Sequence, residues 1–310
     1  MGITERIDRT NNMDEEGWKQ TILPCPKSVK ISLDDNCQFK CSFCVNSTQA
    51  PQDKKRLDWD MFTKLIDELV ENGVEEIGLF FIGEPMLAKN LEQAIRYCKS
   101  KGVEYVFITT NGALATAERV KPLFEAGLDS IKFSFNYTGM DHIKQIANVP
   151  GRTFDKLVEN IRAVHRLRQE GGYKCGIYAS SIMFAGTQQE HMQGAVDQIK
   201  DYVDEHYWLP QYSFGAQASL KTPIFGNPGR LDRMRPTLPC WTIFKEGHVT
   251  AAGAVSLCCF DVHDKWCAGN LHDMTFMEAW NSEIAQKLRA AHLAGNARGT
   301  ACEECAHGKS

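Results

Sequence analysis

The sequence carries little excess charge of either sign, and this absence narrows the partners that the protein can have. Lys and Arg together number 35 and Asp and Glu 39, which gives a formal net charge of −4. Dependence on nucleic-acid phosphates or on anionic membranes calls for a basic excess. We therefore expect neither nucleic acid nor a membrane as a partner.

Long apolar runs are also missing. No segment approaches the roughly 20 apolar residues that a membrane-spanning helix requires. The first 19 residues are polar and acidic, and they lack the basic start and apolar stretch of a secretory signal. These absences predict a cytoplasmic protein, in a compartment where disulfides are disfavoured.

Cysteine, by contrast, is abundant, with 12 residues in a chain of 310. Clustered thiols in a cytoplasmic protein bind metal more often than they form disulfides. One group lies near the start and consists of Cys37, Cys41 and Cys44. The other lies in the last quarter and consists of Cys240, Cys258, Cys259, Cys267, Cys302 and Cys305.

Between residues 28 and 215, strand-like runs alternate with segments of helical periodicity. Such alternation is typical of a parallel α/β sheet with right-handed crossovers. Six units predict an α/β fold, a partial (β/α)6 barrel that is open on one side and keeps its chemistry at the carboxyl ends of its strands. The expected strands are 29–33, 76–81, 105–109, 130–135, 176–183 and 211–214.

The rest of the chain divides into three further segments. Residues 1–27 form an N-terminal extension, and the Pro- and Gly-rich residues 216–239 predict a linker. Residues 240–310 predict a small C-terminal domain. In it we expect a hairpin around Gly253, followed by one helix from about Thr275 to Leu293.

The first cysteine group has the pattern Cys-x3-Cys-x2-Cys and directly follows the first expected strand. Three thiolates within eight residues can bind three irons of a [4Fe–4S] cubane and leave the fourth iron without a protein ligand. A zinc site would require a fourth Cys or His close by, and reduced core cysteines are the other alternative. The spacing favours a cluster with one open iron, which is a site for chemistry.

This motif after the first strand of a βα barrel resembles the radical S-adenosylmethionine (SAM) superfamily. In that family the open iron chelates the amino and carboxylate groups of SAM. An electron from the cluster then splits SAM into methionine and a 5′-deoxyadenosyl radical. The resemblance implies a [4Fe–4S] cluster held by Cys37, Cys41 and Cys44, with SAM as its partner, and a flavodoxin or ferredoxin as electron donor.

The resemblance also implies SAM-binding roles for residues outside the cysteine motif. Phe43 matches the aromatic position that packs near the adenine. The segment Ile82-Gly83-Glu84-Pro85 resembles the Gly-Gly-Glu-Pro motif that binds the SAM amino group, with Ile82 in place of the first Gly. Residues expected around the SAM ribose and methionine are Asn111, Ser134, Asn136 and Ser180; turn and strand-end chemistry is the alternative for them.

The second cysteine group has a spacing of its own. Cys240 is followed after twelve residues by Gly253, then after four by Cys258, and the pattern closes with Cys302 and Cys305. Four thiolates saturate a [4Fe–4S] cluster, and a structural zinc site would use the same four residues.

The segment resembles the short "twitch" form of the SPASM extension of radical SAM enzymes, similar in layout to the butirosin-pathway dehydrogenase, which oxidises a secondary alcohol of an aminocyclitol. A full SPASM domain holds two clusters with about seven cysteines, and this sequence ends five residues after Cys305. The resemblance therefore implies one auxiliary [4Fe–4S] cluster.

Three residues near the second group are candidates for catalysis. Cys259 and Cys267 are not needed as ligands. Each has two alternative roles: a small buried packing residue, or a thiol that returns a hydrogen atom to a substrate radical. Asp261 is a candidate base for a substrate hydroxyl or a solvated turn residue.

These interpretations predict a radical SAM enzyme that removes two electrons from a hydroxylated carbohydrate or aminocyclitol. Radical epimerisation of a sugar or peptide carbon, with a cysteine as hydrogen donor, is an alternative, as is peptide crosslinking or maturation. The alternative from a different class is a non-catalytic module in which both cysteine groups hold structural zinc.

Overall fold

A computed structural model describes residues 2–14, 17–48, 54–182, 187–209, 238–259, 261 and 267–303. Nine strands in these ranges form one sheet in the order β6-β5-β4-β3-β2-β1-β7-β8-β9. Strands β1 to β6 pair in parallel, as the alternating pattern predicts. The strands are β1 (Ser28–Ile31), β2 (Glu76–Gly78), β3 (Tyr105–Thr110), β4 (Ser130–Ser134), β5 (Gly176–Ile182), β6 (Glu205–Leu209), β7 (Glu246–Val249), β8 (Ala254–Ser256) and β9 (Cys267–Asn270).

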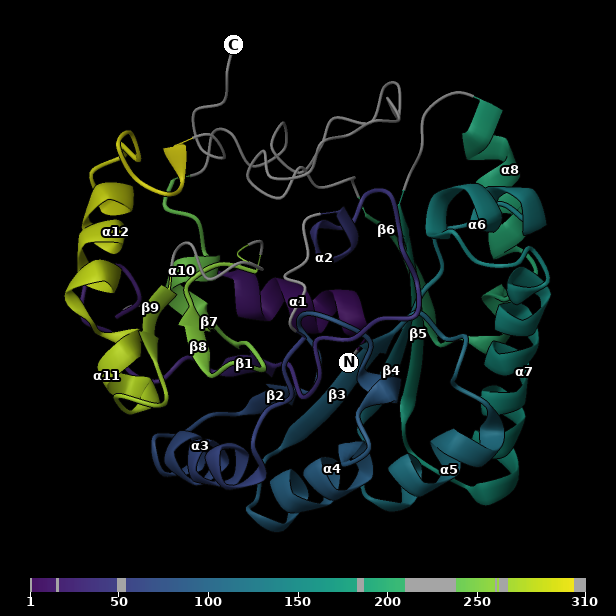
Figure 1. The fold of residues 1–310 in the computed structure, drawn as a ribbon, viewed down its shortest axis with the longest axis horizontal. Coiled ribbons are helices and arrows are strands. Elements are labelled where there is room, and N and C mark those ends of the chain that lie inside the picture. The colour runs from purple at the N-terminus through teal and green to yellow at the C-terminus, as the bar shows by residue number, and fades with distance from the viewer. Residues whose placement is uncertain are drawn as a thin grey trace.

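Helices connect successive parallel strands and cover the outer face of the curved sheet (Figure 1). Helix α3 shows how the sequence builds them: the side chain of Asp58 accepts a hydrogen bond from the Met61 amide, and four apolar residues at helical spacing are buried. The helices are α1 (Ile3–Asn11), α2 (Val45–Thr48), α3 (Trp59–Glu71), α4 (Leu91–Ser100), α5 (Ala117–Glu125), α6 (Met140–Ala147), α7 (Thr153–Gly171), α8 (Thr187–Val196), α10 (Thr242–Lys245), α11 (Phe276–Trp280) and α12 (Glu283–Leu293), with 3-10 turns at η1 (Pro85–Leu87) and η2 (Lys200–Tyr202).

Two faces of the parallel sheet have different chemistry because successive strand residues point in opposite directions. The outward residues, such as Ile77, Ile131 and Ile177, are apolar and fully buried beneath the helices. The inward residues, such as Lys132 and Tyr207, are polar or aromatic and line a cavity. The helices that connect the strands thus stabilise the barrel from outside, and the inner face borders a cavity.

Two expectations about the elements need correction. The sixth strand that pairs with β5 is β6 (Glu205–Leu209), whereas the strand expected at 211–214 lies outside the described residues, as does most of the expected linker. The single helix expected from Thr275 to Leu293 is two helices, because the Asn281 side chain turns away to bond the backbone of Leu23 and Ser282 caps a new start.

The C-terminal strands continue the barrel sheet instead of forming a sheet of their own. Strand β7 pairs in parallel with β1, and β8 and β9 follow antiparallel, so the expected hairpin is present at the free edge of β1. The second cysteine group is therefore built directly beside the strand that leads to the first.

Helix α1 lies on the concave side of the sheet (Figure 1). Thr4 fixes it at the β6 edge of the sheet by bonding Glu205, and Arg6 fixes it at the centre of the sheet by pairing with Glu76 of β2. The first helix of the expected N-terminal extension thus lies inside the barrel. Among the described residues, no helix has the length and apolar character to cross a membrane.

Candidate active site at the carboxyl ends of the strands

The loop after β1 presents Cys37, Cys41 and Cys44, the first cysteine group, at the carboxyl edge of the sheet. Two backbone hydrogen bonds hold it against the end of α6: the Lys40 amide donates to the Ala147 carbonyl at 2.9 Å, and the Ser42 amide to the Ile146 carbonyl at 2.8 Å. All three thiols are partly buried. Contacts of its backbone therefore position the loop.

Each of the three thiols lies in a polar, water-poor setting. Burial raises the pKa of Cys37 to about 11 and that of Cys41 to about 12, and it also raises the pKa of Cys44. The Tyr137 hydroxyl lies 3.5 Å from the Cys41 sulfur. A bound metal deprotonates a coordinating thiol outright, so iron would offset this unfavourable burial of negative charge.

The donor set consists of three thiols on one short loop, which is the chemistry that an iron–sulfur cluster requires. In a [4Fe–4S] cluster each thiolate binds a different iron, so its ligands stand apart. The donor set is thus suited to three irons of such a cluster.

Gly83 brings the loop after β2 into contact with the cysteine loop. Its backbone has a φ of +77°, and a Cβ at this position would lie 2.4 Å from the Asp34 carbonyl oxygen. The next amide, that of Glu84, donates to the Asn36 carbonyl at 2.8 Å. Only glycine permits this approach, which fixes the residues that immediately precede Cys37.

The Glu84 carboxylate is fully buried and directed into the protein. It accepts hydrogen bonds from the Thr110 hydroxyl at 2.5 Å and the amides of Asn111 and Met86 at 2.8 and 3.1 Å. Burial raises its pKa to about 6, against the opposing effect of these bonds. Glu84 thus ties the loops after β2 and β3 together, and its contact with the SAM amino group stays a prediction.

Asn111 connects this arrangement to the cysteines. Its side-chain amide donates to the Cys37 sulfur at 3.8 Å, and its oxygen accepts from Gln38 at 3.0 Å. The predicted residue therefore lies beside a predicted cluster ligand, although the two are far apart in sequence.

Four of the predicted SAM-binding residues lie around one small cavity of about 150 Å³. They come from the cysteine loop, from the end of β4 and from β5. Asn136 is held in place because its side-chain oxygen accepts from the Ile182 amide at 3.0 Å. The cavity is lined by Phe43, Lys132, Ser134, Asn136, Ser180, Ile182 and Leu209.

A larger cavity of about 760 Å³ occupies the inside of the barrel. Its walls are the inward residues of the strands, and helix α1 contributes a further wall. Lys132 and Leu209 line both cavities, so the two adjoin. Cys259 also faces this space, whereas the sulfur of Cys267 bonds the carbonyl of Gly269 in its own strand.

Comparison with known proteins decides the family. Residues 31–199 match the model of the radical SAM superfamily, and residues 240–306 match that of the SPASM iron–sulfur cluster-binding domain. The chain belongs to the radical SAM superfamily.

Individual relatives confirm the fold of this radical SAM protein. The structure of BtrN in complex with AdoMet and 2-DOIA is 17% identical, and the likeness covers 87% of each chain with a TM-score of 0.58. SuiB of Streptococcus suis bound to S-adenosylmethionine is 14% identical over 88% of this chain and 69% of its own, with a TM-score of 0.66.

Curated relatives match a shorter part of the radical SAM protein. A GTP 3′,8-cyclase of Lactiplantibacillus plantarum is 30% identical over 142 residues, which are 45% of this chain and 42% of the cyclase. A PqqA peptide cyclase of Bradyrhizobium diazoefficiens is 31% identical over 110 residues, 36% of this chain and 28% of the cyclase. The chain spans less than half the length of both relatives in these matches.

The second cysteine group of the radical SAM protein is described in part. Cys240, Cys258 and Cys302 are partly buried, and Cys305 lies outside the described residues. The Cys240 amide donates to the His292 ring at 3.2 Å, which ties the start of α10 to α12. Their role as ligands of an auxiliary cluster stays a prediction.

Asp261 is fully buried, and the Ser256 hydroxyl donates to its carboxylate at 3.2 Å. This bond joins the residue to the end of β8. The carboxylate has a structural partner there, and its role as a catalytic base stays a prediction.

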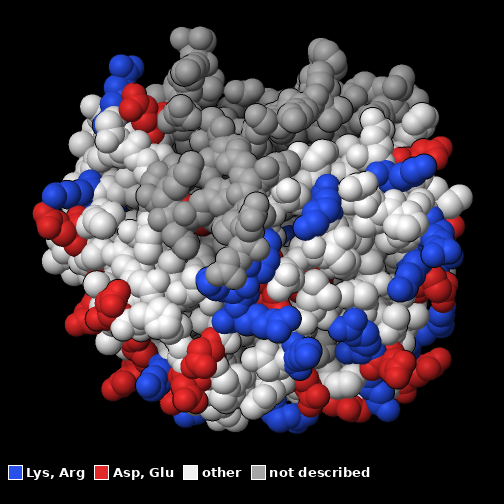
Figure 2. Space-filling model, viewed as in Figure 1, with Lys and Arg blue, Asp and Glu red and all other residues white. Residues whose placement is uncertain are grey.

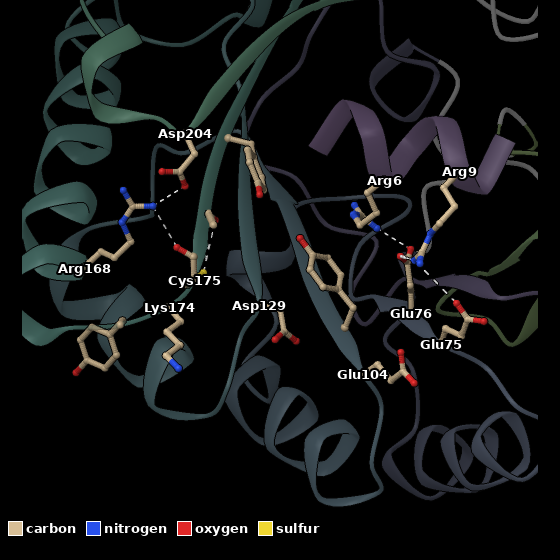
Figure 3. A pocket seen from close by; sticks show the side chains of 14 residues that line it. Arg6, Arg9, Glu75, Glu76, Glu104, Asp129, Arg168, Lys174, Cys175 and Asp204 are labelled. Atoms are coloured by element: carbon tan, nitrogen blue, oxygen red, sulfur yellow. Dashed lines mark hydrogen bonds and ion pairs between the residues drawn. The ribbon is translucent and has the colours of Figure 1, made fainter. Parts of the chain in front are cut away.

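A separate cavity of about 620 Å³ lies at the amino ends of the strands, and no member of the two cysteine groups lines it (Figure 3). Its charged walls are largely matched in pairs, such as Arg168 with Asp204 at 2.5 Å and Arg6 with Glu76 at 2.6 Å. In barrels of this kind the amino end serves stability and the carboxyl end serves chemistry. We assign this cavity no part in the active site.

Three residues of the site escape sequence reasoning. Lys132 lines both cavities, Tyr137 contacts Cys41, and the charge of Lys54 acts on Cys44. The period-2 pattern of β4, which already points to Ser134 and Asn136, includes Lys132 on the same face. Tyr137 and Lys54 carry no comparable signal, because their positions depend on how the loops fold.

Proposed function

We propose that this chain cleaves SAM reductively at a [4Fe–4S] cluster held by Cys37, Cys41 and Cys44, and that it oxidises a hydroxylated small molecule inside the barrel. The cluster and SAM, when bound, supply a 5′-deoxyadenosyl radical. The observation that carries the proposal is the convergence of Phe43, Ser134, Asn136 and Ser180 on one cavity that adjoins the barrel interior.

The protein's own contribution is to position and enclose the reactants. The inward strand residues and α1 form a cavity within the size range of small-molecule sites. Its junction with the small cavity that the predicted SAM-binding residues line supports a substrate C–H bond beside the nucleoside. Transfer of that hydrogen atom yields 5′-deoxyadenosine. Loss of one further electron and the hydroxyl proton completes a two-electron oxidation to the carbonyl.

Cys240, Cys258, Cys302 and Cys305 would hold one auxiliary [4Fe–4S] cluster, which would accept this further electron. A flavodoxin or ferredoxin supplies the electron that starts each SAM cleavage. The pairing of β7 with β1 supports this route, because it places the C-terminal unit beside the strand that precedes Cys37.

Formation of 5′-deoxyadenosine by anaerobically reconstituted, dithionite-reduced protein tests SAM cleavage. Cys41→Ala should abolish it, whereas Cys98→Ala, a buried thiol of α4 outside the site, should retain it. Equal cleavage by the Cys41 variant would refute the assignment. The iron content of a variant with Ala at positions 37, 41 and 44 tests the second centre, with about four irons expected to remain.

Radical epimerisation is a second candidate because Cys259 lines the barrel cavity. A thiol there can return a hydrogen atom to a substrate radical. The two reactions differ in their products: oxidation lowers substrate mass by two hydrogens, whereas epimerisation in D2O leaves one deuterium on carbon. Cys259→Ala should abolish deuterium incorporation if epimerisation is the reaction, and should leave the carbonyl product if oxidation is.

A further inference from the structure

The barrel cavity contains two lysines from the middle of parallel strands, and they have different partners. Lys30 of β1 forms an ion pair with Glu246 of β7. Lys132 of β4 donates to the Tyr207 hydroxyl at 3.3 Å and lies 5.7 Å from the centre of that ring. In the described part of the chain, Lys132 forms no ion pair.

Other charges on the cavity wall do not neutralise Lys132. Arg6 and Glu76 form a buried pair with each other at 2.6 Å, and Glu246 pairs with Lys30. Asp8 of α1 is exposed, so water screens its charge. A half-buried ammonium whose protein partner is a neutral hydroxyl is suited to an anionic ligand, since a charge pair in a partly desolvated site is stronger than one in water.

The position of Lys132 relates this charge to the reaction. It lies on the same face of β4 as Ser134 and lines both the barrel cavity and the small cavity around the predicted SAM-binding residues. An anionic group bound to its ammonium would therefore hold a substrate at the junction of the two. On the face shown in Figure 2, Lys and Arg gather near the centre and acidic side chains lie mainly toward the rim, a distribution that favours the approach of anions.

We propose that Lys132 is a substrate-binding residue and that the substrate is a small hydroxylated molecule with a carboxylate or phosphate group. The inference rests on the proposed function, since it takes the barrel cavity as the substrate site. It also narrows that function: a cationic aminocyclitol is disfavoured beside Lys132, and an acidic or phosphorylated sugar is favoured.

Calorimetric titration of the reconstituted protein with SAM bound tests this inference. The probes are glucose 6-phosphate and glucuronate, with glucose and glucosamine as uncharged and cationic counterparts and inorganic phosphate as the minimal anion. The wild-type protein should bind at least one anionic probe about 10- to 100-fold more tightly than glucose, the range expected for a hydrogen bond to a charged group. Tighter binding of glucose 6-phosphate would identify the anionic group of the substrate as a phosphate, and tighter binding of glucuronate would identify it as a carboxylate.

Lys132→Gln should lose this preference and Lys132→Arg should keep most of it. The matched control is Lys64→Gln, which removes the same charge from the exposed face of α3. If the wild-type protein binds none of the anionic probes more tightly than its Lys132→Gln variant does, the inference is wrong.

SAM cleavage separates this inference from the proposed function. The far-UV circular dichroism and the iron content of Lys132→Gln should equal those of the wild type, which shows that the variant folds. A large rise in the SAM concentration that Lys132→Gln needs for half-maximal cleavage would assign Lys132 to SAM binding and overturn the inference. Absence of SAM cleavage in the wild type would instead refute the proposed function, independently of the binding result.

Discussion

Arg6 of helix α1 lies inside the barrel with its guanidinium 2.6 Å from the carboxylate of Glu76, at the start of β2. Both side chains are buried, and the guanidinium also stacks at 4.4 Å on the rings of Tyr105 and Phe107. This contact joins a segment at the start of the chain to the centre of the sheet. The wall of the barrel cavity that α1 forms depends on it.

Removal of one partner of this pair should destabilise the protein strongly. Arg6→Ala leaves the Glu76 carboxylate buried without its main partner, and we expect the free energy of unfolding to fall by about 3–5 kcal/mol. Arg9→Ala is the control, because Arg9 contacts Glu76 from an exposed position and should cost less than about 1 kcal/mol. Urea unfolding measures both, and equal effects would contradict a buried pair.

Gly83→Ala should disrupt the active site more than the strain of a positive φ alone would. The new Cβ would lie 2.4 Å from the Asp34 carbonyl and so displace the residues that precede Cys37. Gly73→Ala shares a positive φ but meets no atom within 4 Å, so it should cost only about 1–2 kcal/mol. We expect SAM cleavage to be lost in the Gly83 variant and kept in the Gly73 variant, measured as 5′-deoxyadenosine. Full activity in both would show that the loop can move without cost.

The buried Glu84 should make stability depend on pH. Its pKa is raised from 4.5 to about 6, so the folded protein binds this proton more tightly than the unfolded chain does. Its contribution to stability is complete below pH 4.5 and decreases as pH rises through 6, by about 2 kcal/mol. Glu84→Gln cannot titrate, so the difference in unfolding free energy between the two proteins should change over this range. A constant difference from pH 4 to 7 would contradict the shift.

Arg289 should be essential for the packing of the C-terminal helices. Its guanidinium lies 4.3 Å from the Trp280 ring and donates to the carbonyls of Ile243 at 2.9 Å and Thr21 at 3.0 Å. Arg289→Lys keeps a charge but lacks the planar group that makes these bonds together, so we expect a loss of about 2–3 kcal/mol. Thermal unfolding measures this loss. Lys287→Ala, on the exposed side of α12, is the control and should change the unfolding temperature little. An equal effect of the two substitutions would contradict the role of Arg289.

Much of the candidate site follows from local sequence pattern. The cysteine spacing predicts an iron–sulfur loop, and the alternation of β4 places Ser134 and Asn136 on one face of a strand. Parallel strands end at a common edge, so residues after β1, β4 and β5 meet without further information. Phe43, Ser134, Asn136 and Ser180 accordingly line one cavity.

Other features depend on contacts between segments that are distant in sequence. The expected helix from Thr275 to Leu293 is interrupted because Asn281 bonds Leu23, a residue 258 positions away. No local periodicity encodes such a bond. Sequence pattern also misplaces the sixth strand, because a short edge strand is defined by pairing with its neighbour and not by composition alone.

Local sequence pattern predicts the parallel barrel, the three thiols and the resemblance to the radical SAM family, because strand alternation and ligand spacing are properties of neighbouring residues. The tertiary structure decided that α1 enters the barrel, that β7 extends the sheet at β1, and that Lys132 lies between two cavities. These relationships arise from the pairing of buried charges and unsatisfied strand edges across long stretches of chain, whose geometry exists only once the chain is folded.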